Sequence, residues 1–326
     1  RPPRSTLFPY TTLFRSKEAR KEAARSDIRA LIPVLLEWIE KGDRPIEKAP
    51  QFPSAICPLC GSETLILPLS EPDNFGGSDT DLCTHSLSSS AHGSMVSVCL
   101  HCRYARYRDD FTKPLSDDQR DRLNDALAAR RKAPAPSNPS LLKGWEPFEL
   151  TAISMTALGD ESGRIGMAWL QAGWAARRGL CAPTLEVVAE PGMFMPDMAE
   201  KLIKETDDGT FHNLYLCALV AHRAGLVSAR DKYFSRAQKM VLGDDTREAL
   251  LKSGVRIAEQ EDGLLKEAFQ WLSKATEGTR DAEFNRYICA DLMRRLGRER
   301  EARKALKDCL DLPRVGPMAR KLLDSL

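Results

Sequence analysis

Two pairs of closely spaced cysteines constrain this chain more than any other feature. The first pair is Cys57-Pro-Leu-Cys60, followed by Gly61, and the second is Cys99-Leu-His-Cys102. Two intervening residues allow a tight turn to direct both thiolates toward one point, and two such turns supply the four ligands of a tetrahedral zinc ion. The spacing therefore predicts one structural zinc site with the ligands Cys57, Cys60, Cys99 and Cys102.

Two other roles for these cysteines are less consistent with the sequence. Redox chemistry at one pair, with His101 favouring the thiolate, requires a βαβ context that the residues around Cys99 do not provide. A catalytic zinc ion requires an open coordination position, which four cysteine ligands do not leave. The chain has nine cysteines, an odd number that does not suit a secreted disulfide scaffold, so we expect a cytoplasmic protein.

A second group of metal-ligating residues lies between the two pairs. Cys83, His85 and His92 follow Asp79 and Asp81 in a segment rich in Ser and Gly. The residue types permit a second metal site, but no CxxC-like pair anchors one. We favour a solvated loop with an isolated cysteine, and the second site stays open as an alternative.

The first residues have a character of their own. Residues 1–16, RPPRSTLFPYTTLFRS, resemble the translation of a sequencing adapter, and we expect an artefactual or disordered tail there. This tail contributes Arg1, Arg4 and Arg15 and no acidic residue, so the net charge of +2 becomes −1 without it. A nearly neutral chain has no general electrostatic attraction to nucleic acid or to an anionic membrane.

The remaining chain divides by composition. We predict a mostly α-helical protein in which a small four-cysteine β ribbon precedes helical hairpins, and no stretch approaches the ~18 apolar residues of a membrane span. The predicted regions are a helical lead-in and connector (17–53), a zinc-ribbon domain with a trailing helix (54–131), a Pro-rich linker (132–144) and a helical repeat domain (145–326).

Internal similarity supports the repeat domain. Leu214–Gly225 aligns without a gap with Arg286–Gly297, and Trp169–Gly179 is a weaker third copy. Each of the two clear copies places a glycine where a turn between two helices is expected. This pattern is typical of tetratricopeptide-like helical hairpins, although the spacing between copies is irregular.

The helical copies also suggest where a partner binds. If the two clear copies are equivalent first helices, their exposed positions line one concave groove. The groove residues predicted in this way are His222, Arg223, Arg294 and Arg295. The equivalent arginines Arg223 and Arg295 favour a protein or peptide partner with acidic side chains, with ordinary solvated arginines as the alternative.

Nucleic acid is the alternative partner. Arg103–Arg108 alternates basic and aromatic residues directly after the second cysteine pair, as a nucleic-acid-binding segment does. However, residues 51–118 contain nine acidic and four basic side chains, which disfavours a polyanion. The chain also lacks a P-loop, a Rossmann fingerprint, a nucleophile elbow and an HExxH motif, so we do not expect an enzyme.

Four stretches together resemble a known bacterial family. They are CPLCGS, DTDLC (79–83), VCLHCRYARYRDDF (98–111) and AWLQAGWAARRG. The chain resembles the family known only as domain of unknown function 2225, whose members combine two cysteine knuckles with tetratricopeptide-like helices. The resemblance implies this architecture and the same four zinc ligands, and it implies no reaction. Leu100 and Arg103 depart from the proline and glycine that are usual in the second knuckle.

Overall fold

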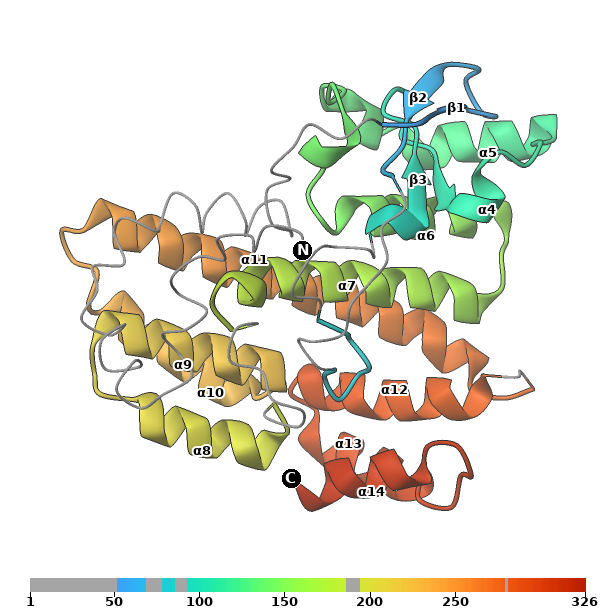
Figure 1. The fold of residues 1–326 in the computed structure, drawn as a ribbon. Coiled ribbons are helices and arrows are strands. Elements are labelled where there is room, and N and C mark those ends of the chain that lie inside the picture. The colour runs from blue at the N-terminus through green and yellow to red at the C-terminus, as the bar shows by residue number, and fades with distance from the viewer. Residues whose placement is uncertain (1–51, 69–77, 86–92, 186–193, 279–280) are drawn as a thin grey trace, which may run out of the picture.

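The structure is a computed structural model that describes residues 52–68, 78–85, 93–185, 194–278 and 281–326 (Figure 1). It is mostly helical, with two small β-hairpins near the N-terminal end of the described chain, as the sequence predicts. The predicted tail 1–16 and nearly all of the lead-in 17–53 lie outside the described residues, as does His92.

Each hairpin of the ribbon surrounds one cysteine pair. Strand β1 (Ser54–Ile56) pairs antiparallel with β2 (Glu63–Leu65), with Ala55 opposite Thr64. Strand β3 (Val96–Val98) pairs in the same way with β4 (Ala105–Tyr107). The turn between the strands of each hairpin contains a CxxC sequence, so the fold brings the tips of the two hairpins together.

Short helices support the ribbon. They are α4 (Arg108–Phe111), α5 (Asp117–Leu127) and α6 (Glu146–Leu158). Ser116 caps α5 by accepting a hydrogen bond from the Gln119 N–H, while the Gln119 side chain accepts one from the Ser116 N–H. Leu123 and Leu127 of α5 are fully buried and share a core with the cysteine turns. The ribbon is therefore packed onto helices and does not stand alone.

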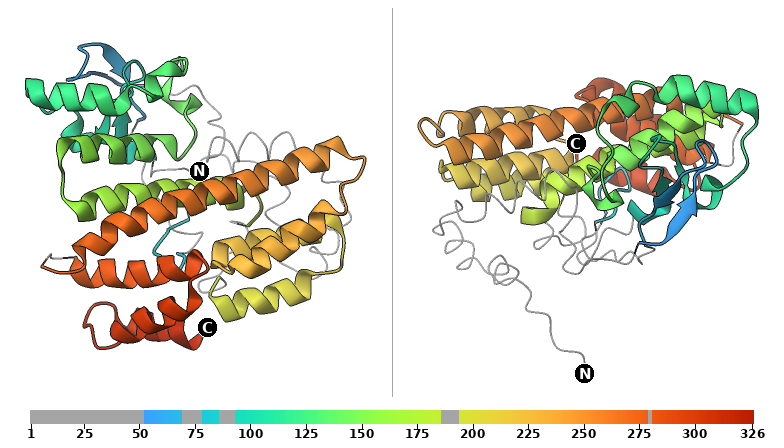
Figure 2. Two further views of the ribbon diagram at one scale, coloured as in Figure 1. Left: turned by 180° about the vertical axis from the view of Figure 1, so that it is seen from behind. Right: turned by 90° about the horizontal axis from the view of Figure 1, so that it is seen from above.

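The larger part of the molecule consists of antiparallel helices (Figures 1 and 2). The helices are α7 (Ser162–Leu185), α8 (Pro196–Thr206), α9 (Phe211–Ala224), α10 (Val227–Gln238), α11 (Asp245–Leu272), α12 (Ala282–Arg295), α13 (Glu299–Asp308) and α14 (Gly316–Asp324). The two longest, α7 and α11, lie against each other, and the helical hairpins are arranged along them. No helix in the described residues has the length and apolar character needed to cross a membrane.

Two of the predicted repeat copies form helical hairpins. Gly225 ends α9 with φ +71°, and Gly297 follows α12 with φ +77°, so each glycine makes the left-handed turn that precedes α10 or α13. The weaker third copy, Trp169–Gly179, contains no turn. Gly179 lies inside the continuous helix α7, because the residues around it are buried and keep the helical hydrogen bonding.

One short segment far from these helices in sequence lies among them. Ser78–His85 comes from the connection between the two ribbon hairpins, and it is drawn in teal between α7 and α12 in Figure 1. Ser78 and Thr84 form an antiparallel bridge, and the Asp79 N–H donates to the Cys83 carbonyl at 2.8 Å. The segment is thus a compact turn inserted into the helical part of the molecule.

Candidate metal centre

The two cysteine turns have the same backbone geometry. In the first, the Gly61 N–H donates to the Cys57 carbonyl at 2.9 Å and the Cys57 N–H donates to the Ser62 carbonyl at 3.0 Å. In the second, the Arg103 N–H donates to the Cys99 carbonyl and the Cys99 N–H donates to the Tyr104 carbonyl, both at 2.8 Å. Each CxxC sequence therefore forms a closed knuckle that turns two thiols to the same side.

A positive φ angle closes both knuckles. Gly61 has φ +71°, as expected for a glycine after the second cysteine. Arg103 occupies the matching place with φ +65°, although a side chain makes this conformation unfavourable. Its guanidinium donates to the Pro134 carbonyl at 2.7 Å, which favours the strained backbone. The departure from the usual glycine therefore leaves the shape of the second knuckle unchanged.

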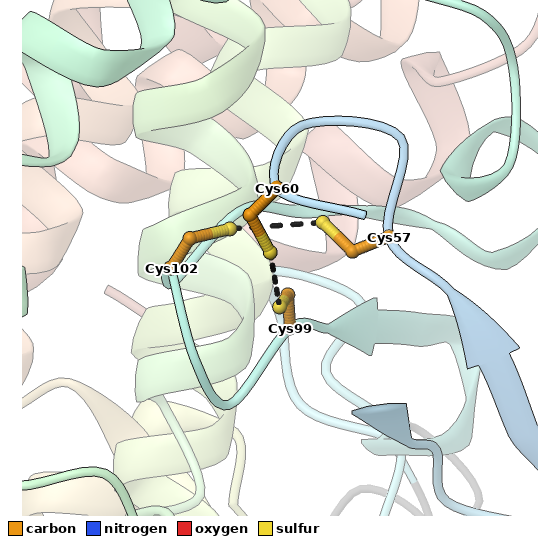
Figure 3. A group of neighbouring side chains, drawn as sticks. All are labelled: Cys57, Cys60, Cys99 and Cys102. Carbon is orange, nitrogen blue, oxygen red and sulfur yellow. Dashed lines mark hydrogen bonds between the residues drawn. The ribbon is translucent and has the colours of Figure 1, made fainter. Parts of the chain in front are cut away.

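The four predicted ligands converge (Figure 3). The Sγ atoms of Cys57 and Cys102 are 3.6 Å apart, those of Cys60 and Cys99 are 3.7 Å apart, and all four lie within 4.8 Å of one another. Four sulfur atoms at ~2.3 Å from a tetrahedral zinc ion are separated by ~3.8 Å. The thiols thus fit a zinc ion, and each close pair joins one knuckle to the other.

The site is shielded on one side and open on the other. Cys57, Cys99 and Cys102 are buried, whereas Cys60 is exposed. Hydrogen bonds from Cys102 and Cys57 lower the pKa of the Cys99 thiol to about 2, and a hydrogen bond with Cys57 raises the pKa of Cys102. Hydrogen bonds from neighbouring thiols thus stabilise the thiolate form of Cys99. A metal ion bound by all four cysteines would displace the protons of those neighbouring thiols.

Neighbouring side chains hold the knuckles in position. The Thr64 hydroxyl on β2 donates to the Val98 carbonyl at 3.4 Å and accepts from the Leu100 N–H at 3.1 Å, which links the two hairpins. Arg131 donates to the Cys102 carbonyl at 2.9 Å. These bonds add to the contacts that hold the two knuckles near each other.

Comparison with known proteins finds a family model that matches the segment containing the four cysteines. Residues 54–184 match the model of a family described as an uncharacterized protein conserved in bacteria (DUF2225). Over that segment the chain is similar to this family. The match begins at β1 and ends within α7, so it includes all four cysteines. No curated protein and no solved structure matches the chain.

The predicted partner groove requires a correction. His222, Arg223, Arg294 and Arg295 were expected to be exposed, but their exposed fractions are only 5, 1, 2 and 3%. The structure does bring the equivalent arginines together, since Arg295 Nη1 donates to the Arg223 carbonyl at 3.0 Å. These side chains point inward because buried carboxylates are their partners, and helical periodicity alone does not distinguish such a face from a solvated one.

Two of the four carboxylates come from the inserted segment. Asp79 accepts from Arg177 Nη1 at 3.0 Å and from Arg223 Nε at 2.9 Å, while Asp81 accepts from Arg177 Nη2 at 2.7 Å. We call the whole set the arginine–carboxylate cluster. Its members are Asp79, Asp81, Arg177, Arg223, Glu261, Asp291, Arg294 and Arg295. The sequence pointed to Arg223, Arg294 and Arg295 as groove residues and to Asp79 and Asp81 as loop residues. Nothing in it indicated that these residues pair, or that Arg177, Glu261 and Asp291 join them.

The cluster also changes the interpretation of the possible second metal site. Asp79, Cys83 and His85 offer ligand atoms within 4.8 Å of one another, but all three are buried, so the predicted solvated loop is wrong. Both oxygens of Asp79 already accept hydrogen bonds from guanidinium groups, and burial raises the pKa of the Cys83 thiol to about 12. A cation here would face arginines and a neutral thiol, which are poor surroundings for a metal ion.

The basic and aromatic segment 103–108 is integrated into the protein. Tyr104 is buried, and Arg106 is buried and paired with Asp160 at 2.9 Å. Tyr107 donates to the Gln171 side chain at 2.7 Å, and Arg108 donates to the Leu67 carbonyl at 2.8 Å. These side chains join the ribbon to the helices, so the segment does not form the exposed face that a nucleic acid would need.

Proposed function

We propose that the chain is a zinc-binding protein in which the ion is structural and the molecule works by binding another protein. The convergence of four thiols at separations of 3.6 and 3.7 Å carries the metal part of this proposal. Four thiolates complete a tetrahedral shell and leave no position for water or substrate. A structural role follows from that shell, and a catalytic one does not.

The place of the thiols in the fold supports the structural role. Each close sulfur pair joins the two hairpins, which are otherwise linked mainly by the hydroxyl of Thr64. Strands of three residues are too short to hold a sheet together alone. An ion at this point would fix the ribbon against α5 and α6, where Leu123 and Leu150 contribute to the same core.

The binding role has two supports. The helical part consists of antiparallel hairpins, an architecture that serves recognition in many proteins. In addition, the side chains on which nucleic-acid binding would depend, Arg103 and Arg106, are buried and bonded within the protein. We therefore favour a protein partner over a nucleic acid, a binding role over an enzymatic one, and the cytoplasm as the compartment, where thiols stay reduced.

Metal analysis tests the first part of this proposal. The full chain is purified without chelator, and its zinc is counted by elemental analysis together with its free thiols. We expect one zinc ion per chain, with Cys57, Cys60, Cys99 and Cys102 protected from alkylation until a chelator is added. Full alkylation of these cysteines before chelation, in protein that contains no metal, would contradict the proposal.

Affinity capture tests the second part. The full chain is used as bait on two portions of the same bacterial extract, one of which has been treated with nuclease, and direct binding to duplex DNA and RNA is measured at physiological salt. We expect the same captured proteins in both portions and no shift of either nucleic acid. Proteins that disappear after nuclease treatment, together with direct nucleic-acid binding, would favour the alternative.

A further inference from the structure

The segment Ser78–His85 contacts the helices in the way that a bound peptide does. It lies 93 to 215 residues away in sequence from the helical side chains to which it is bonded. Its own backbone bonds close a turn, from the Asp79 N–H to the Cys83 carbonyl and from the Leu82 N–H to the Asp79 carbonyl. Leu82, with φ +69°, reverses the chain. The turn thereby presents Asp79, Thr80 and Asp81 to the helices.

Each of these three residues has a dedicated set of partners. Asp79 accepts from Arg177 and Arg223, and Asp81 accepts from Arg177 and from the indole N–H of Trp174 at 3.1 Å. The Thr80 hydroxyl donates a hydrogen bond to Asp291 at 2.7 Å and accepts hydrogen bonds from Arg294 at 2.9 Å and from Arg295 at 3.0 Å. The Thr80 carbonyl accepts a hydrogen bond from the Tyr287 hydroxyl at 2.7 Å.

The two helical hairpins recognise the segment in parallel ways. Arg223 at the end of α9 and Arg295 at the end of α12 are equivalent in the sequence alignment of the hairpins. Arg223 Nε lies 2.9 Å from Asp79, and Arg295 Nε lies 3.5 Å from Asp81. Equivalent positions of two similar units thus face the two carboxylates of one Asp-x-Asp sequence.

The charges are complementary only when the segment is present. Among helical side chains of the arginine–carboxylate cluster, four guanidinium groups and two carboxylates leave a net charge of +2, which Asp79 and Asp81 offset. The buried Arg178, whose charge acts on Cys83 and His85, adds a further positive charge on the helical side. Buried charges require such pairing, because desolvation of an unpaired ion is costly. The helices alone therefore form a basic groove suited to a dianionic peptide.

We propose that this face of α7, α9 and α12 is a recognition groove for an Asp-Thr-Asp peptide and that Ser78–His85 is its ligand, bound within the same chain. The proposal rests on the protein-binding role above for its biological use, but its test requires neither a foreign partner nor a particular metal content. In this arrangement Ser78–His85, which lies between the two cysteine pairs in the sequence, also attaches the ribbon to the helices.

Cleavage on both sides of the segment tests the proposal. Recognition sequences for a site-specific protease are placed within residues 69–77 and within residues 86–92 of the full chain, and the folded protein is cut at both. We expect the excised peptide to co-elute with the rest of the protein in size-exclusion chromatography. A labelled synthetic Ser78–His85 peptide should exchange with it, as followed by mass spectrometry.

Matched variants identify the contacts responsible. Asp79→Asn combined with Asp81→Asn keeps the shape of the segment and should weaken retention of the excised peptide about 100-fold or more, because charge-assisted hydrogen bonds are lost. The control combines Arg300→Gln with Arg320→Gln, both at exposed positions, and should retain the peptide like the parent protein.

Three outcomes would overturn the proposal. One is release of the parent peptide at micromolar protein concentration, and another is equal retention of the double Asn peptide. The third is loss of helical circular dichroism when the parent protein is cut, which would make the segment a folding element rather than a ligand. Failure of the external-partner experiment would leave all three unaffected, so the two ideas can fail separately.

Discussion

The molecule contains two buried polar centres that are built in opposite ways. The thiol cluster draws its members from two short turns, and within each turn the cysteines are three positions apart. The arginine–carboxylate cluster draws on the inserted segment and on four helices, from Asp79 to Arg295. The first centre is set by local backbone geometry and the second by the tertiary packing of the whole helical part.

This difference determines how each centre contributes to stability. An ion held by four thiolates contributes binding free energy of its own, which the unfolded chain cannot retain. In a buried ion pair, the free energy gained by attraction approximately cancels the cost of desolvating the two charges. Such a pair therefore affects stability most when one partner is removed and the other charge stays buried. The thiol cluster should therefore depend on an external ligand, whereas the arginine–carboxylate cluster should depend on the completeness of its own network.

Loss of a thiol should have the largest effect. Cys57→Ser should abolish zinc binding and unfold the ribbon, because structural zinc contributes on the order of 10 kcal/mol in small zinc domains. Zinc content by elemental analysis and ribbon protection by hydrogen exchange provide the measurement. Cys83→Ala, a buried cysteine of the other centre, is the matched control and should keep one zinc ion per chain. Loss of zinc in the control would mean that Asp79, Cys83 and His85 also bind metal.

Loss of Arg177 should have the next largest effect. Its side chain is fully buried and bonded to Asp79, Asp81 and Glu261, so Arg177→Met removes a charged partner from three buried carboxylates at once. Removing one partner from a buried network costs about 3–5 kcal/mol. Urea unfolding measures the loss, with Arg230→Met as a control at the half-exposed partner Asp262. Equal losses of unfolding free energy in the two variants would mean that Arg177 contributes no more to stability than an arginine in a single ion pair.

The two centres also differ in how far the sequence predicts them. The knuckles, the capping Ser116 and the turn glycines Gly225 and Gly297 depend on neighbouring residues, so their spacing is visible in the sequence. The pairing of Asp79 with Arg223 joins residues 144 positions apart, and no local period encodes it. Helical periodicity placed Arg223 and Arg295 on one face but could not show that the face was buried.

The same limit explains the interpretation of the DTDLC stretch. Two aspartates among serines and glycines have the composition of a solvated loop, and only the arginines of distant helices make their burial possible. The absence of a turn in the weaker third copy has a related explanation. Gly179 has the residue type of a turn, but α7 continues through it because the surrounding residues pack on both sides.

Lowering the pH should destabilise the protein through His85, next to the arginine–carboxylate cluster, and the loss of unfolding free energy should be smaller than that caused by Arg177→Met. Burial lowers the pKa of His85 to about 4 from an ordinary value of 6.5, with Asp79 acting in the opposite direction and Arg223 adding to the depression. A histidine whose folded pKa is depressed stabilises the fold fully above pH 6.5, and this contribution is lost as the pH falls toward 4. The loss is at most about 3 kcal/mol.

The comparison of parent protein with His85→Gln isolates this contribution. Unfolding free energies are measured between pH 7 and pH 4, and the difference between the two proteins should narrow as the pH falls. His212→Gln on α9 provides a comparison, because burial lowers the pKa of His212 as well but without Arg223 adding to the depression. A difference that stays constant with pH would show that His85 does not titrate in this window.

The smallest effect is expected where the two knuckles themselves differ. Arg103→Gly should remove the cost of a left-handed side-chain residue, about 1 kcal/mol, and should also remove the hydrogen bond to the Pro134 carbonyl, of similar size. The two changes oppose each other, so the melting temperature should move by about 2 °C or less. In the first knuckle, Gly61→Ala introduces a side chain at a positive φ angle and gains no hydrogen bond in return. Because a Cβ there meets no atom within 4 Å, the stability lost by this variant reflects the backbone strain alone. If Arg103→Gly destabilises as much as Gly61→Ala, the bond to Pro134 outweighs the backbone strain. In that case the second knuckle depends on packing against residues 132–144, and the thiol cluster is less local than its spacing indicates.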